Sequence, residues 1–72
     1  MRGPDFEMGR VTEWRVGADG AGRLVLEDGS SWSIAASSPM FAGIRATVEL
    51  AQQLGALLVV SGNRRTGQLA GA

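Results

Sequence analysis

The chain has 72 residues, enough for one small domain (residues 1–72) with a thin hydrophobic core. It contains no cysteine and no histidine, which excludes disulfides and the usual zinc or copper ligands, so we expect neither a metal nor a cofactor. Seven arginines balance seven acidic residues and lysine is absent, a composition that gives no overall positive charge and is typical of a GC-rich, bacterial-like coding bias.

The first half of the chain predicts a meander of three strands. They are Phe6–Val16, Arg23–Glu27 and Ser30–Ala35. Gly9 is a candidate bulge at which the first strand could bend. Asp28-Gly29 predicts a two-residue hairpin with a type I′ turn, in which both central residues have positive φ.

Counting by twos separates two faces of these strands. The predicted core face carries Trp14, Val16, Leu24, Leu26, Trp32 and Ile34. The opposite, solvated face carries Glu13, Arg15, Arg23, Val25, Glu27, Ser31 and Ser33. The four aromatic residues, Phe6, Trp14, Trp32 and Phe41, are all expected on core faces.

A helix is predicted next, with Ser38 as its N-cap and Pro39 in its first turn. Its apolar stripe comprises Phe41, Ile44, Val48, Ala51 and Leu54, widened by Met40 and Thr47. Gly55 is expected to end the helix in the left-handed conformation. Ala56–Ser61 then predicts a strand that is apolar on both faces. A turn over residues 62–67 and a short last strand, Gln68–Ala70, complete the chain.

This order, three meandering strands, a helix and a closing hairpin, resembles the oligonucleotide/oligosaccharide-binding (OB) fold, a small five-stranded barrel. The long first strand with a glycine near its middle is also similar to that fold. The competing prediction is an open antiparallel sheet of three or four strands with one helix packed on it.

An enzyme is not expected, because histidine, cysteine, lysine and tyrosine are all missing and the serines have no base to activate them. The resemblance to the OB fold instead implies a binding module, with single-stranded nucleic acid as the ligand. The candidate ligand-binding residues are Arg10, Arg15, Arg23, Ser31, Ser33, Arg64 and Arg65.

Cold-shock proteins are an informative comparison, since Gly9–Trp14 is similar to their first strand. That family carries exposed aromatic residues on its second and third strands, where this chain has Arg23, Val25, Ser31 and Ser33. The stacking surface is therefore missing, and any binding would rest on contacts with phosphates.

Two other functions remain open. A homo-oligomeric or partner-docking protein would use an apolar interface, for which the candidates are Val11, Val25, Leu57 and Val59. An oligosaccharide site could use Trp14 and Trp32, although two tryptophans on an inward face are typical of a core. The N-terminus has no signal peptide and no apolar run could span a bilayer, so we expect a cytoplasmic protein.

Overall fold

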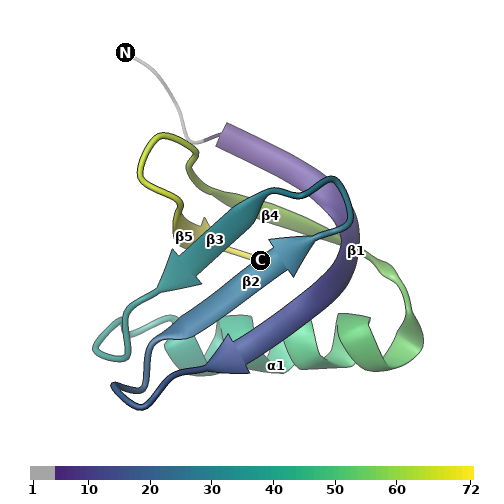
Figure 1. Ribbon diagram of the computed structural model, residues 1–72. Helices are drawn as coiled ribbons and strands as arrows, with labels where there is room; N and C mark the ends of the chain where they lie inside the picture. Colours follow the sequence, from purple (N-terminus) through teal and green to yellow (C-terminus); the bar gives the residue numbers. More distant parts are fainter. Residues whose placement is uncertain (1–4) are drawn as a thin grey trace.

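The computed structural model, which describes residues 5–72, is a closed five-stranded barrel with one helix (Figure 1). Its elements are β1 (Asp5–Val16), β2 (Gly22–Leu26), β3 (Ser31–Ile34), α1 (Phe41–Leu54), β4 (Leu57–Asn63) and β5 (Gln68–Gly71). Around the barrel the strands follow the order β1-β2-β3-β5-β4. The predicted OB-like barrel is confirmed, and the open sheet is wrong.

β1 belongs to both halves of the barrel. Its residues 5–10 pair antiparallel with β4, and its residues 11–16 pair antiparallel with β2. Figure 1 shows it as a long strand that curves around the barrel wall while the other strands stay short. A strand that changes neighbours midway joins the two ends of the sheet, and so closes the barrel.

The irregularity in β1 lies at Thr12 and not at the predicted Gly9. Val11 faces Leu26 and Glu13 faces Val25, so Thr12 is one residue too many against β2. The Thr12 Oγ1 donates a hydrogen bond of 3.0 Å to the Val25 carbonyl oxygen. A side-chain hydroxyl that can bond a neighbouring carbonyl makes Thr12 suited to this position.

The β2–β3 turn has three residues, 27–29, between the hydrogen-bonded residues Leu26 and Ser30. The predicted type I′ turn is therefore wrong. Among residues 5–72 only glycines have positive φ, so Asp28 does not, whereas Gly29 has φ 90°. The Gly29 N–H donates to the Leu26 carbonyl (2.9 Å), and the Leu26 N–H donates to the Ser30 carbonyl (3.0 Å). This is a type I turn followed by a left-handed glycine, the usual three-residue hairpin loop.

The helix begins two residues later than the Ser38 N-cap implied. Met40 is its N-cap, without a side-chain hydrogen bond. The Ser38 carbonyl accepts from the Phe41 N–H (3.1 Å) and its hydroxyl oxygen accepts from the Met40 N–H (3.3 Å), so Ser38 stabilises a separate turn before the helix. The other end agrees with the prediction, because Gly55 has φ 64° and caps α1 in the left-handed conformation.

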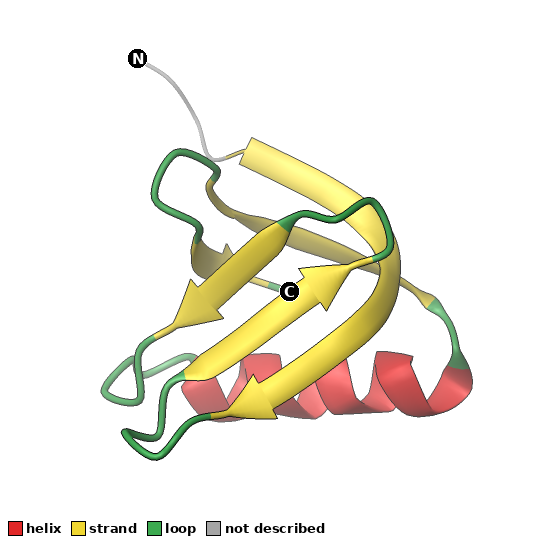
Figure 2. Ribbon diagram, viewed as in Figure 1, coloured by secondary structure: helices red, strands yellow, loops and turns green. Residues whose placement is uncertain are grey.

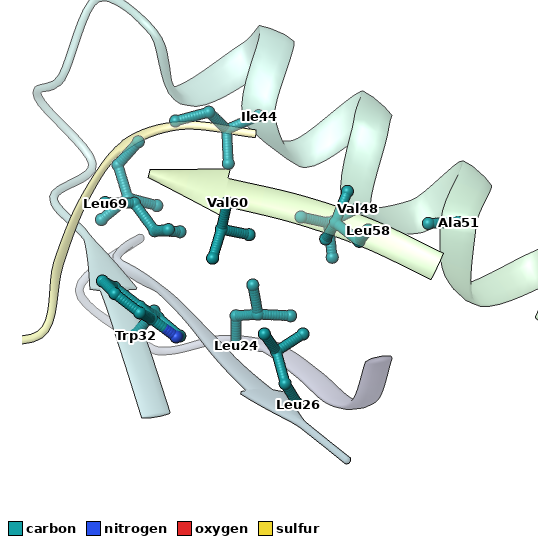
Figure 3. Close-up of a cluster of buried hydrophobic side chains, with 10 residues drawn as sticks. Leu24, Leu26, Trp32, Ile44, Val48, Ala51, Leu58, Val60 and Leu69 are labelled. Atoms are coloured by element: carbon teal, nitrogen blue, oxygen red, sulfur yellow. The ribbon is translucent and has the colours of Figure 1, made fainter. Parts of the chain in front are cut away.

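The hydrophobic core fills the interior of the barrel and continues between the barrel and α1. The helix lies along one end of the barrel (Figure 2). Its buried residues are Leu24, Leu26, Trp32, Ile34, Ile44, Val48, Ala51, Leu58, Val60 and Leu69. Figure 3 shows side chains from the helix approaching β4, and Val60 and Leu24 pointing toward one another across the interior. Trp32, the largest of them, is 1% exposed.

Five predictions of burial are wrong, and most of these errors lie where an element ends. Val16, the last residue of β1, and Leu54, the last residue of α1, are both exposed. Phe6 is exposed because it points outward from the half of β1 that pairs with β4. Met40, expected on the helix stripe, is exposed at the N-cap. Thr47, expected to widen the helix stripe, is exposed within α1.

Among residues 5–72, no helix has the length and apolar content needed to cross a membrane.

Candidate functional site

A row of polar side chains crosses four strands of the barrel. Arg15 on β1 faces Arg23 on β2, Arg23 faces Ser33 on β3, and Ser33 faces Gln68 on β5. All four residues are exposed. With neighbouring strands about 4.8 Å apart, the row extends for about 14 Å over the outer surface. We call these four residues the polar row.

Two like charges lie side by side at one end of the polar row. Directly opposed like charges destabilise a pair of antiparallel strands. Arg15 lies 3.4 Å from Glu13, but the two side chains are 77% and 42% exposed, so this ion pair offsets little of the repulsion. Within residues 5–72 the Arg23 guanidinium has neither a hydrogen bond nor an ion pair. An anion that contacted both guanidinium groups would relieve the repulsion.

The next row along the strands is mixed in character. Glu13 faces Val25, and Val25 faces Ser31. Val25 is half-buried, and Ser31 is exposed beside the β4–β5 turn, whose Gly67 approaches the Ser31 carbonyl oxygen. The acidic Glu13 limits the positive surface to the end of the strands that carries the two arginines.

The structure does not bring all seven predicted ligand residues together. Arg15, Arg23, Ser31 and Ser33 share the outer face of β1–β3. Arg65 is an exposed residue of the β4–β5 turn, which contacts β3 through the hydrogen bond from the Ser33 N–H to the Gly67 carbonyl (2.6 Å).

Arg10 and Arg64 are held elsewhere by contacts within the chain. The Arg10 Nε donates to the Gly55 carbonyl oxygen (3.1 Å). The Arg64 Nη2 lies 2.6 Å from the Glu7 Oε2 and 3.1 Å from the Phe6 carbonyl oxygen. The Arg10 contact ties β1 to the end of α1, and the Arg64 contacts tie the start of the β4–β5 turn to β1. Both arginines therefore act in the structure of the barrel.

Gln68 is a site residue that sequence reasoning missed. Its strand pairs in parallel with β3, and sequence order alone does not reveal this pairing. A cleft of about 160 Å³ opens at the same junction. It is lined by Ser33, Ile34, Ala35, Ser38, Gln68 and Leu69. The polar row therefore ends at a small depression with hydroxyl and amide groups on its walls.

Among residues 5–72, no aromatic ring is available beside the polar row for stacking on a base or a sugar. Trp32 is in the core, and its indole N–H donates to the Ser30 Oγ (3.2 Å). Trp14 packs against Phe41, with ring centroids 6.4 Å apart, and its Nε1 donates to the Glu49 Oε2 (3.3 Å). Both tryptophans therefore have structural partners.

The predicted interface residues divide between three environments. Val11 is half-buried and packs against the core. Val25 lies on the face of the polar row. Leu57 and Val59 are exposed on β4, on a different face of the barrel, next to Met8 of β1.

Acidic groups offer no metal centre in the described chain, since residues 5–72 contain no cluster of three or more potential ligands. One carboxyl has a perturbed pKa. The Ser30 hydroxyl, and then the Ser30 N–H, donate to the Asp28 Oδ1 (2.6 and 2.8 Å) and lower the Asp28 pKa below its ordinary value of 3.8. Smaller contributions from Glu7 and Arg64 act in the same direction.

Comparison with known proteins found no matching family model, no matching curated protein and no matching solved structure.

Proposed function

We propose that this chain is a non-enzymatic binding module and that its polar row binds the phosphate backbone of single-stranded nucleic acid. The observation that carries the proposal is the position of Arg15 directly opposite Arg23, with no acidic partner for Arg23 among residues 5–72. Guanidinium groups donate to phosphate oxygens in a fixed fork, so two adjacent arginines suit two neighbouring phosphates.

The remaining residues of the row supply uncharged donors. The Ser33 hydroxyl and the Gln68 amide extend the row toward the cleft between β3 and β5. Hydroxyl and amide groups commonly contact phosphate and sugar oxygens in such complexes. A row about 14 Å long suits a short site of about four nucleotides, the lower end of the range for this kind of barrel.

Without stacking rings the binding would be electrostatic, weak and tolerant of base sequence. Stacking on aromatic side chains contributes about 1–3 kcal/mol per base in other single-strand binders, and the polar row offers none of it. The interaction should therefore weaken steeply as salt is added, because binding releases counterions from the phosphates.

The test is fluorescence anisotropy of a labelled, mixed-sequence single-stranded DNA or RNA, titrated with the protein at several salt concentrations. We expect saturable binding at low salt. The Arg15→Gln/Arg23→Gln variant should bind more weakly, and the slope of log K against log salt should fall by about 1.4, or about 0.7 for each lost phosphate contact.

Arg45→Gln is the matched control. Arg45 lies on α1, exposed and paired with Glu49 four residues later, so this change removes the same charge as either single substitution but leaves the polar row intact. If the double variant and the control bind alike, or if the natural chain does not bind at low salt, the proposal is wrong.

A further inference from the structure

A second face of the barrel is apolar and is not covered by any other part of residues 5–72. β1 and β4 pair antiparallel, with Met8 opposite Val59, Phe6 opposite Ser61 and Arg10 opposite Leu57. The alternate residues of β4, Leu58 and Val60, point into the core. The side chains of Phe6, Met8, Leu57 and Val59 are 64%, 58%, 55% and 53% exposed. We call these four residues the apolar face.

The barrel itself does not explain the apolar face. Leu57 and Val59 alternate with core residues along β4, so the strand is apolar on both sides, which is typical of a strand that is covered on both sides. Here the fold covers one side only. Large apolar residues that cluster on a surface, in contrast to scattered ones, mark sites of interaction.

We propose that a second copy of this chain covers the apolar face, so that two barrels pack through their β1–β4 surfaces. This contact lies on a different face from the polar row and does not depend on nucleic-acid binding. A two-fold arrangement needs one surface that is complementary to itself. A patch of apolar side chains without opposing charges meets that requirement.

The charges on this surface support a like partner. Among the outward-facing positions of residues 6–10 and 57–61, Arg10 is the one charged side chain, and its Nε is already bonded to the Gly55 carbonyl. Arg10 keeps its single positive charge at the edge of the patch, while the four apolar side chains carry no charge that would select a partner of opposite sign. The chain as a whole has seven positive and seven negative residues, so two copies approach without net repulsion.

The exposed area of the patch supplies about two thirds of the area that a specific dimer interface needs. The four side chains expose on the order of 400 Å², about a tenth of the 4699 Å² surface of the barrel. Two such patches together remove roughly 800 Å² from water, and specific interfaces begin near about 1,200 Å² in total. Arg10, Ser61 and the connection between α1 and β4 border the patch, and the proposed dimer requires that they contribute the remaining area.

The experiment is sedimentation or light-scattering mass measured over a range of protein concentrations. The natural chain, with a monomer mass of 7.5 kDa, should have twice that mass and dissociate on dilution. Val59→Glu should raise the dissociation constant by about a hundredfold or more, because each dimer would bury two unpaired carboxylates. Met8→Gln, which adds no charge, should raise the dissociation constant of the dimer by about tenfold.

Val16→Glu is the matched control. It makes the same substitution at another exposed valine of the sheet, at the far end of β1, and should leave the mass unchanged. Circular dichroism would establish that each variant keeps its fold; should Val59→Glu unfold, Met8→Gln decides the test.

Three results would overturn the proposal. They are a natural chain that is monomeric up to about 1 mM, a mass above two copies, or folded Val59→Glu and Met8→Gln variants that remain dimeric. The first of these would leave a different protein or a lipid surface as the occupant of the apolar face.

Discussion

Three residues link the surface of the β2–β3 turn to the interior of the barrel. The Trp32 indole N–H donates to the Ser30 Oγ, and the Ser30 hydroxyl donates to the Asp28 Oδ1. Trp32 is the largest buried side chain, and its one polar atom has a partner because Ser30 ends the turn at the right position. Asp28 orients that serine by accepting hydrogen bonds from both its hydroxyl and its backbone N–H.

The lowered pKa of Asp28 leads to a prediction about pH. Since its folded-state pKa lies below 3.8, the ionised carboxylate contributes stability above that pH, and this contribution is lost as the pH falls through the folded-state pKa. Asp28→Asn should therefore lower the free energy of unfolding near neutral pH, and the difference from the natural chain should shrink in acid. Denaturant titrations between neutral pH and pH 3 would measure this.

Ser30→Ala serves as the companion variant, because it removes the hydroxyl that lowers the Asp28 pKa most. It should reduce the pH dependence in the same range. Parallel stability curves for the natural chain and Asp28→Asn over the whole range would contradict this account.

Two glycines show how the element around a residue decides the effect of one substitution. Gly43 lies in α1, and a Cβ there would have open space around it. Gly62 lies in β4, and a Cβ there would run into the Gln68 carbonyl oxygen of β5. The same added methyl group therefore meets solvent in one case and backbone in the other.

We expect opposite changes in stability from these two substitutions. Gly43→Ala should raise the free energy of unfolding by about 0.8–1 kcal/mol through helix propensity. Gly62→Ala should lower it by about 1–3 kcal/mol or more, since β5 must move away from β4. Denaturant midpoints of the two variants measure both effects, and a neutral Gly62→Ala would show that β5 is held loosely.

The elements themselves were predictable from the sequence because each depends on local patterns. Residues three and four apart placed Ile44, Val48 and Ala51 on the buried face of α1, and alternation placed Leu24, Leu26, Trp32 and Ile34 in the core. What failed depends on partners distant in the chain. The register shift at Thr12, the exposure of Phe6 and the position of Gln68 opposite Ser33 all follow from strand pairing around the barrel.

The candidate site was predictable in part for the same reason. Alternation places Arg23 and Ser33 on one face, but only the pairing registers make Arg15, Arg23 and Ser33 direct neighbours. The contacts of Arg64 with Glu7 and Phe6 join residues far apart in sequence. No local pattern therefore separates this structural arginine from Arg23, whose side chain has no partner within residues 5–72.

At the scale of the whole molecule, the barrel is closed unevenly. β1 and β4 pair along residues 5–10 and 57–62, whereas β3 and β5 meet through one facing pair, Ser33 and Gln68. Local opening follows the number of interactions that must break, so the junction between β3 and β5 should open most readily.

Native-state hydrogen exchange measures this difference. The Ser33 amide, bonded to the Gly67 carbonyl across that junction, should exchange faster than the most protected amides of β1 and β4. If the Ser33 amide is among the slowest in the chain, the junction is as stable as the rest of the barrel and the prediction is wrong.

The division of β1 between two neighbours also has a consequence for biosynthesis. Residues 11–16 can pair as soon as β2 has been made, but residues 5–10 pair with a strand about fifty positions later, from 47 to 57. At about 5–20 residues per second, roughly 3–10 s pass before the ribosome has added that strand. During this time Phe6 and Met8 lie on a strand whose backbone has no partner on one side. The apolar first half of β1 is therefore made early in synthesis, and its backbone hydrogen bonds form only when β4 is present.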